Sequence, residues 1–67
     1  MATSGLDLRL ERVAARVRLK TLADAMKRHR ATVANYENAA VVSPEIATAY
    51  RDALATLTEV ADEGTAA

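Results

Sequence analysis

The segment from Leu22 to Asn38, LADAMKRHRATVANYEN, most constrains the fold, because its helical repeat of apolar residues is interrupted once. The apolar positions fall into two groups: Leu22, Ala23 and Met26, then Val33 and Tyr36. The interval from Met26 to Val33 is too long for one continuous stripe. The pattern therefore predicts a helix over residues 19–26, a basic turn at 27–29 and a second helix over residues 30–37.

Composition favours an all-α fold for the whole chain. The 67 residues include sixteen Ala, the best helix former, but only one Pro and two Gly. There is no Cys, Phe or Trp, which excludes disulfides, thiolate metal sites and large aromatic anchors. We expect one domain over residues 1–67. A domain of this size buries only about 60% of the surface that its unfolded chain exposes, so self-association is expected.

A helix over residues 5–16 is predicted before the central segment. Ser4 and Asp7 have capping-box spacing. Apolar residues then repeat at helical intervals: Leu6, Leu10, Val13, Ala14 and Val17. The stripe changes face at Leu19, which indicates a bend or loop near residues 16–19. One long kinked helix is the alternative.

A long helix over residues 44–63 is predicted after a loop at 38–42. Ser43-Pro44-Glu45 supplies an N-cap, a Pro in the first turn and an acidic residue. Gly64 is the expected stop. One face of this helix is apolar: Ile46, Tyr50, Ala53, Leu54, Leu57 and Val60. Tyr50 is assigned to the core. Strand patterns are absent.

The net charge is zero, but the charges are separated along the chain. Residues 1–36 carry eight basic and three acidic residues, whereas residues 37–67 carry one basic and six acidic residues. This asymmetry predicts a phosphate-facing half and an acidic half turned away from it. The alternative is a chance distribution.

No sequence pattern indicates secretion, a membrane span or a catalytic centre. Charged residues interrupt the N-terminal apolar residues, and no apolar run approaches the roughly 20 residues of a spanning helix. His29 is the only His, and no nucleophile–base pair, paired carboxylates or glycine-rich phosphate loop is recognisable. We expect a cytoplasmic protein, associated with the nucleoid of a bacterial cell, that has no membrane partner, no cofactor, no metal and no small-molecule ligand. An enzyme is the least supported class.

Residues 6–57 resemble the helix-turn-helix domains of Cro-type and XRE-type phage repressors. The matching positions are Leu22-Ala23, Thr32-Val33 and Glu37-Asn38, followed by Ser43-Pro44 and Ile46. The resemblance implies a lambda-repressor-like domain of four helices, or five, with its helix-turn-helix over residues 19–38. It also implies that Ala23 lies at a close helix crossing. Leu22, Met26, Val33 and Tyr36 would form the core that fixes the two helices, and Glu37 would tie the second helix to the domain.

The chain departs from this family in its turn. Lys27 occupies the usual Gly position, where a positive φ costs a non-Gly residue roughly 1 kcal/mol. Arg28 stands where a small apolar residue is usual, which thins the core and makes the turn more basic. Other family residues are replaced by Arg18, Leu19, His29 and Ala39.

The resemblance implies that the second helix reads base edges in the major groove of double-stranded DNA. The expected base contacts are Arg30, Ala31, Ala34 and Asn35. Arg can bind guanine bidentately, Asn can read adenine, and Ala can touch a thymine methyl. The expected phosphate contacts are Lys20, Lys27, Arg28, His29 and Thr32. For all of these residues the alternative is an ordinary solvated helix surface, and Thr32 could also merely fill space.

Some apolar residues exceed what one small core needs: Val41, Val42, Leu54, Leu57 and Val60. One hypothesis is that they form a homodimer seam that sets two recognition helices about 34 Å apart. The alternative is that they pack under the first helix.

Two functions fit these sequence features. The first is a sequence-specific DNA-binding transcriptional regulator, a small Cro-like repressor of phage or mobile-element origin. The second is a protein-interaction module with the same fold, such as an antirepressor, an adaptor or an antitoxin. The missing turn glycine and the zero net charge favour the second.

Overall fold

The computed structural model describes the backbone of residues 2–66 and the side chains of residues 2–58. Within this part of the chain the fold is all-helical, with four helices and no strand. The helices are α1 (Gly5–Ala14), α2 (Leu19–Met26), α3 (Arg30–Asn38) and α4 (Pro44–Ala66). A single antiparallel bridge joins Thr3 to Val42 in the loop before α4. The all-helical prediction and the count of four helices are confirmed.

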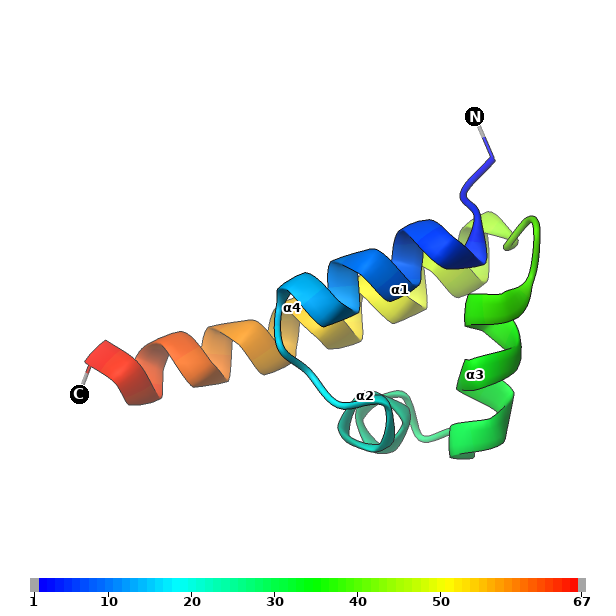
Figure 1. The fold of residues 1–67 in the computed structure, drawn as a ribbon. Coiled ribbons are helices and arrows are strands. Elements are labelled where there is room, and N and C mark those ends of the chain that lie inside the picture. The colour runs from blue at the N-terminus through cyan, green and yellow to red at the C-terminus, as the bar shows by residue number, and fades with distance from the viewer. Residues whose placement is uncertain (1, 67) are drawn as a thin grey trace.

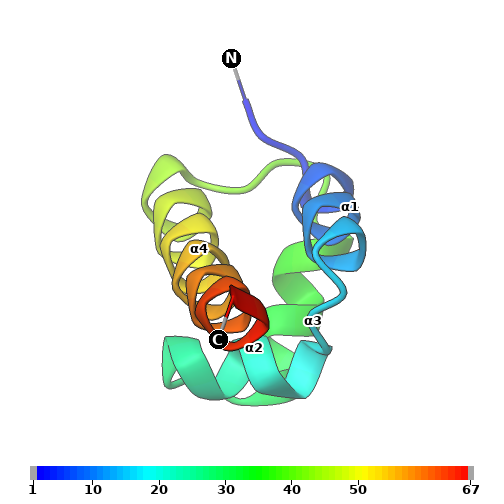
Figure 2. The same cartoon turned by 90° about the vertical axis from the view of Figure 1, so that its left-hand side faces the viewer.

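The helices α1 and α4 lie side by side and run in the same direction (Figure 1). The C-terminal end of α3 lies beside the N-terminal ends of α1 and α4 (Figure 1), and α2 closes the opposite side of the core from α1 (Figure 2). The packed pairs include α1 with α3, α2 with α3, and α2 with α4. The last part of α4 extends beyond the other three helices (Figure 1).

Local capping explains where two of the helices begin. The Ser4 side chain accepts a hydrogen bond from the Asp7 amide at 3.1 Å, as the capping-box spacing predicted. The Ser43 side chain accepts one from the Ile46 amide at 3.3 Å, and α4 starts at Pro44. These bonds satisfy amides that a helix leaves unpaired in its first turn.

Three helix ends differ from the predicted ones. Helix α1 stops at Ala14, two residues early, because the chain turns over residues 15–18 with Arg16 at a φ of 60°. This turn confirms the predicted break and excludes one long kinked helix. Helix α3 ends at Asn38, one residue late. The expected stop at Gly64 is wrong, since α4 continues to Ala66; a Gly inside a helix costs only about 1 kcal/mol.

The core lies between all four helices. Its buried residues are Leu8, Leu22, Ala23, Val33, Val42, Ala47, Tyr50 and Leu54. Met26 and Tyr36 are half-buried and pack against this cluster. The predicted contacts between α2 and α3, and the assignment of Tyr50 to the core, are therefore confirmed.

The apolar repeat that predicted α1 does not form its buried face. Leu6, Leu10 and Val13 are exposed, whereas Gly5 and Leu8 are buried. Gly5 lies against the end of α3, and its amide donates a hydrogen bond to the Ala39 carbonyl at 2.9 Å. Only a residue without a side chain permits this approach. The rotation of α1 therefore follows from the close contact at Gly5 and the burial of Leu8, and not from the repeat of Leu6, Leu10 and Val13.

The predicted dimer seam needs correction at two of its residues. Val42 and Leu54 are only 5% and 7% exposed in the single chain, so they belong to its core. Leu57 also packs against the core, while Val41 is 64% exposed. The side chain of Val60 lies outside the described residues. One chain thus uses most of the apolar residues that had suggested a seam.

The replacement Gly5→Ala tests the close approach of α1 to α3. An added Cβ would overlap the Tyr36 carbonyl oxygen and lie 2.5 Å from that of Glu37. We expect the free energy of unfolding to fall by about 1–3 kcal/mol, despite the better helix propensity of Ala. Chemical denaturation measures this change. Arg9→Ala, at an exposed site on the same helix, should have little effect; equal effects of both replacements would contradict a steric role for Gly5.

The replacement Lys27→Gly tests the strain in the turn between α2 and α3. Lys27 has a φ of 58°, which Gly adopts without a Cβ clash. We expect stabilisation by about 0.5–1 kcal/mol, since relief of the clash exceeds the entropy that Gly adds to the unfolded chain. Thermal and chemical unfolding measure it. Lys27→Ala removes the same charge but keeps the Cβ, so stabilisation by Ala as large as that by Gly would refute the backbone explanation.

Candidate nucleic-acid interface

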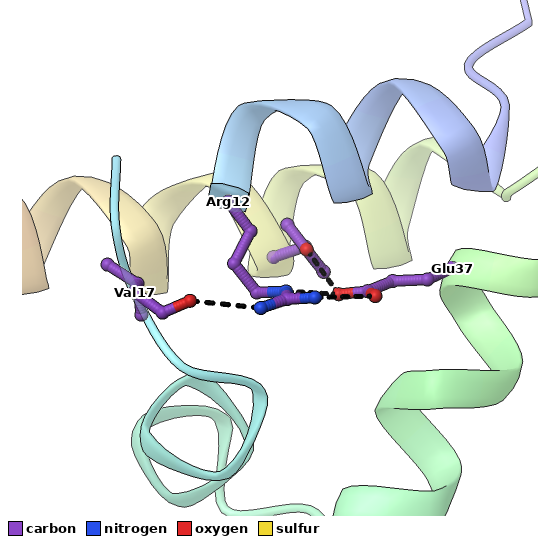
Figure 3. A network of polar contacts seen from close by, with 4 residues as sticks. Arg12, Val17 and Glu37 are labelled. Atoms are coloured by element: carbon purple, nitrogen blue, oxygen red, sulfur yellow. Dashed lines mark hydrogen bonds and ion pairs between the residues drawn. The ribbon is translucent and has the colours of Figure 1, made fainter. Parts of the chain in front are cut away.

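The C-terminal end of α3 is fixed by Glu37, the only buried charged residue among the described side chains (Figure 3). Arg12 of α1 donates to both Glu37 carboxylate oxygens, from Nε at 2.7 Å and from Nη2 at 3.2 Å. The Tyr50 hydroxyl of α4 donates to Oε2 at 2.6 Å. One carboxylate thereby joins α1, α3 and α4. The implied role of Glu37 in tying α3 to the domain is confirmed.

The same arginine also holds the chain between α1 and α2. Arg12 Nη1 donates to the Val17 carbonyl at 3.0 Å, which lies in the turn between the two helices (Figure 3). Arg12 is therefore neutralised and largely buried, although the charge count placed it in the basic half of the chain. It contributes to positioning α3 rather than to a surface that faces phosphates.

Burial and hydrogen bonding shift the protonation of this network. Burial, followed by the hydrogen bond to Glu37, raises the pKa of the Tyr50 hydroxyl above its usual value. The hydrogen bond to Glu37 also raises the pKa of Arg12. Tyr50 therefore remains a donor and Arg12 a cation at neutral pH.

The outer face of α3 carries most of the predicted base contacts. Arg30, Ala31 and Asn35 are exposed, whereas Ala34 is half-buried and lies at the edge of this face. Asn38 is also exposed, three residues after Asn35 and one turn further along the helix. The only acidic residue of α3 is Glu37, which is buried. No carboxylate therefore lies on the outer face of α3.

The predicted phosphate contacts are partly brought together beside α3. Lys20, Arg28, His29 and Arg30 line a shallow depression of about 380 Å³, together with Asp24. Lys27 is exposed in the adjoining turn. Thr32 is half-buried, so little of it remains for an outside contact. The basic turn thus forms one surface with the start of α3.

The start of α3 is capped by His29, an expected phosphate contact that stands where the resembled family usually has a Ser or Thr cap. His29 Nδ1 accepts a hydrogen bond from the Ala31 amide at 3.1 Å, so His29 takes the capping role that Ser or Thr has in many helices. At α2 the N-cap Arg18 makes no side-chain hydrogen bond. The first amides of α2, next to Lys20, therefore remain open to an outside anion.

Two residues of this region were not predicted from the sequence. Arg12 lies one turn after Leu8, on the same buried face of α1, and that spacing was the available signal. The sequence predicts Asn38 as the first residue of the loop, because the expected helix ends at residue 37. Had α3 been extended by one residue, Asn38 would have joined Ala31 and Asn35 on the outer face.

In the described part of the chain, no three side chains of His, Asp and Glu gather to hold a metal ion. Within the same residues, no helix is long and apolar enough to cross a membrane.

The replacement Tyr50→Phe tests the network through its pH dependence. At neutral pH we expect the free energy of unfolding to fall by about 1–2 kcal/mol, because a hydrogen bond to a charged group is removed. The folded pKa of Tyr50 is raised, so its contribution is complete below the unfolded value of about 10 and is lost as the pH rises above that value. The stability difference between wild type and variant should therefore stay constant from neutral pH up to about pH 9 and shrink as the pH rises above about 10.

Denaturation at several pH values measures this difference. Tyr36→Phe is the matched control, because it removes a tyrosine hydroxyl outside the Glu37 network. If the difference in the free energy of unfolding between wild type and Tyr50→Phe stays constant to the highest pH at which the protein folds, the Tyr50 hydroxyl is not held by Glu37.

Comparison with known proteins adds no relative to this description: no family model, no curated protein and no solved structure matches the chain.

Proposed function

We propose that this protein is a sequence-specific double-stranded DNA-binding regulator. In this proposal α2, the turn and α3 form a helix-turn-helix, and α3 enters the major groove. The observation that carries the proposal is the exposed outer face of α3, free of carboxylates and continuous with the basic depression at its N-terminal end. The resemblance to Cro-type and XRE-type repressors supports the same conclusion.

The outer face of α3 has suitable chemistry for reading bases. Arg30 can donate two hydrogen bonds to guanine, and Asn35 can pair with adenine. Ala31 lets the helix approach the base edges closely. Asn38, one turn beyond Asn35, can reach a further base or a phosphate. Each well-formed bidentate pair contributes about 1–3 kcal/mol of discrimination against a wrong base.

The basic depression has suitable chemistry for the DNA backbone. Lys20, Arg28 and His29 are exposed beside the start of α3. Contacts of this kind add affinity without sequence information and make binding sensitive to salt. Lys27 extends the same surface into the turn.

The buried network supports such a role by fixing α3 relative to the rest of the domain. Base readout requires that a helix keep its angle and depth in the groove, since a small displacement loses bidentate geometry. Arg12 and Tyr50 hold Glu37 from two other helices. A rigid reading helix on a small core is the arrangement that this function needs.

The wider biological role follows from the resemblance alone. It implies a repressor of phage or mobile-element origin that acts on the nucleoid of a bacterial cell. Regulation would then act through the protein's concentration, its self-association or a partner.

Selection of bound duplexes from a random DNA pool tests the proposal. We expect an enriched sequence, with affinity that falls steeply as salt increases. Enrichment of an inverted repeat with half-sites about 34 Å apart would indicate a dimer on DNA. Weak, salt-sensitive binding with no enriched sequence would contradict sequence-specific recognition.

Variants then separate base contacts from phosphate contacts on the selected duplex. Arg30→Ala and Asn35→Ala should each relax specificity at one base pair. Each should also weaken the binding free energy for the selected duplex by about 1–3 kcal/mol. Lys20→Ala should weaken binding to all duplexes alike and reduce the salt slope by about 1. Arg9→Ala is the control, because it removes an exposed positive charge on α1. Equal losses for Arg9→Ala and Lys20→Ala would indicate a general charge effect.

A second candidate is a protein-interaction module with this fold. A surface hollow of about 560 Å³ lies between α2, α3 and α4, and it favours such a module. Its lining combines Met26, Tyr36 and Ile46 with the charged residues Arg28, Glu45 and Asp52. The double variant Arg28→Ala/Arg30→Ala distinguishes the two: retained biological activity with lost DNA affinity would favour the protein partner.

A further inference from the structure

His29 lies at the junction between the basic depression and the start of α3. Its backbone is extended, as an N-cap requires, and its Nδ1 accepts a hydrogen bond from the Ala31 amide at 3.1 Å. The same side chain lines the depression with Lys20, Arg28 and Arg30. One imidazole ring therefore belongs both to the first turn of the helix proposed to read bases and to the surface proposed to contact phosphates.

The hydrogen bond from Ala31 determines which nitrogen of His29 carries a proton. A ring nitrogen that accepts from a backbone amide has no hydrogen of its own, so a neutral His29 keeps its hydrogen on Nε2. The two nitrogens lie on different sides of the ring, and Nε2 is therefore directed away from the Ala31 amide. Because the side chain is exposed and lines the depression, its Nε2–H is a donor available to a phosphate oxygen.

We propose that His29 is a positioning residue that acts in its neutral form, with Nδ1 capping α3 while Nε2–H donates to a DNA phosphate. This inference rests on the proposed DNA binding by α3. It gives His29 an effect on sequence discrimination that a phosphate contact alone does not have, because the cap orders the turn that carries Arg30 and Ala31. Both of these residues are expected base contacts, whereas the His29 ring itself reads no base.

Protonation of His29 removes the cap. The second proton on the ring occupies Nδ1, which becomes a donor and can no longer accept from the Ala31 amide. A cation at this end of α3 is also unfavourable, because the helix dipole places partial positive charge at the N-terminus. The first turn of α3 must then be ordered when Arg30 engages its base. This requirement weakens binding only to a duplex whose sequence the turn reads.

The same protonation strengthens contact with phosphates. It adds a positive charge to a depression that Lys20, Arg28 and Arg30 line together with one carboxylate, that of Asp24. Every duplex shares this added attraction, because phosphate contacts carry no sequence information. The ratio of the affinities for the selected duplex and for a random duplex cancels the shared contribution and leaves the effect of the cap. Acidification should therefore lower specificity rather than the affinity for DNA in general.

This affinity ratio, measured at about pH 8 and about pH 5.5, tests the inference, because histidine ordinarily changes its charge between these values and His29 is the only His of the chain. We expect the wild-type ratio to fall by about fivefold at the lower pH, the effect of losing one N-cap. His29→Asn is the matched variant, since Asn caps helices without titrating, and it should keep the wild-type ratio at both pH values. His29→Ala should show the lowered ratio at both. A wild-type ratio that stays constant, or an equal fall in His29→Asn, would overturn the inference.

Nuclear magnetic resonance of the free protein tests the cap without DNA. At about pH 8 the ring nitrogens of His29 should show the Nε2–H form with Nδ1 unprotonated. The Ala31 amide should also exchange with solvent more slowly than in His29→Ala. A ring with its hydrogen on Nδ1 would overturn the inference, whatever the result with DNA. A random pool that yields no enriched sequence would overturn the DNA-binding proposal itself, whereas an enriched sequence with a constant affinity ratio would overturn only the role of His29.

Discussion

The structure depends on one buried carboxylate. Glu37 sits at the end of α3 and receives Arg12 from α1 and Tyr50 from α4, so three helices meet at a single side chain. A buried ion pair adds little net stability over an apolar replacement, because desolvation offsets the attraction. Its effect here is to define geometry: removal of any one partner would leave a charge or a donor unpaired inside a small core. The network therefore fixes the C-terminal end of α3 against α1 and α4.

Local signals in the sequence predicted most of the helices. Ser4, Ser43 and Pro44 act through bonds within one turn, so their effects do not depend on the tertiary fold. The turn between α2 and α3 was predicted because the apolar repeat broke there. The rotation of α1 could not be predicted in this way. Its hydrophobic repeat faces outward, since Gly5 permits close contact with α3 and Arg12 needs Glu37, and both constraints connect residues far apart in the sequence.

Part of the candidate site could also be predicted, because local spacing along a helix determines which of its residues share a face. Exposure of Arg30 and Asn35 followed from helical spacing, and Lys20 could be grouped with the basic turn once two helices were assumed. The count of basic residues in the first half of the chain overstated the basic surface, because Arg12 forms an internal ion pair with Glu37. Val42 and Leu54 were expected in a seam, but they are buried in the core of the single chain, which has no Phe or Trp and is built mainly from aliphatic side chains. The unused apolar residues are instead on α1, where the contact at Gly5, the burial of Leu8 and the ion pair of Arg12 leave them facing outward.

We propose that α3 and the basic turn form the surface that binds DNA. The most direct test is a nuclear magnetic resonance titration of the labelled protein with a duplex obtained by selection, following each backbone amide. We expect large shifts over the start of α2, the turn at residues 27–29 and the outer face of α3, and little change at the exposed residues Leu6, Leu10 and Val13 of α1. Shifts confined to α1, or to the hollow between α2 and α4, would contradict this claim and would assign the binding function to another surface.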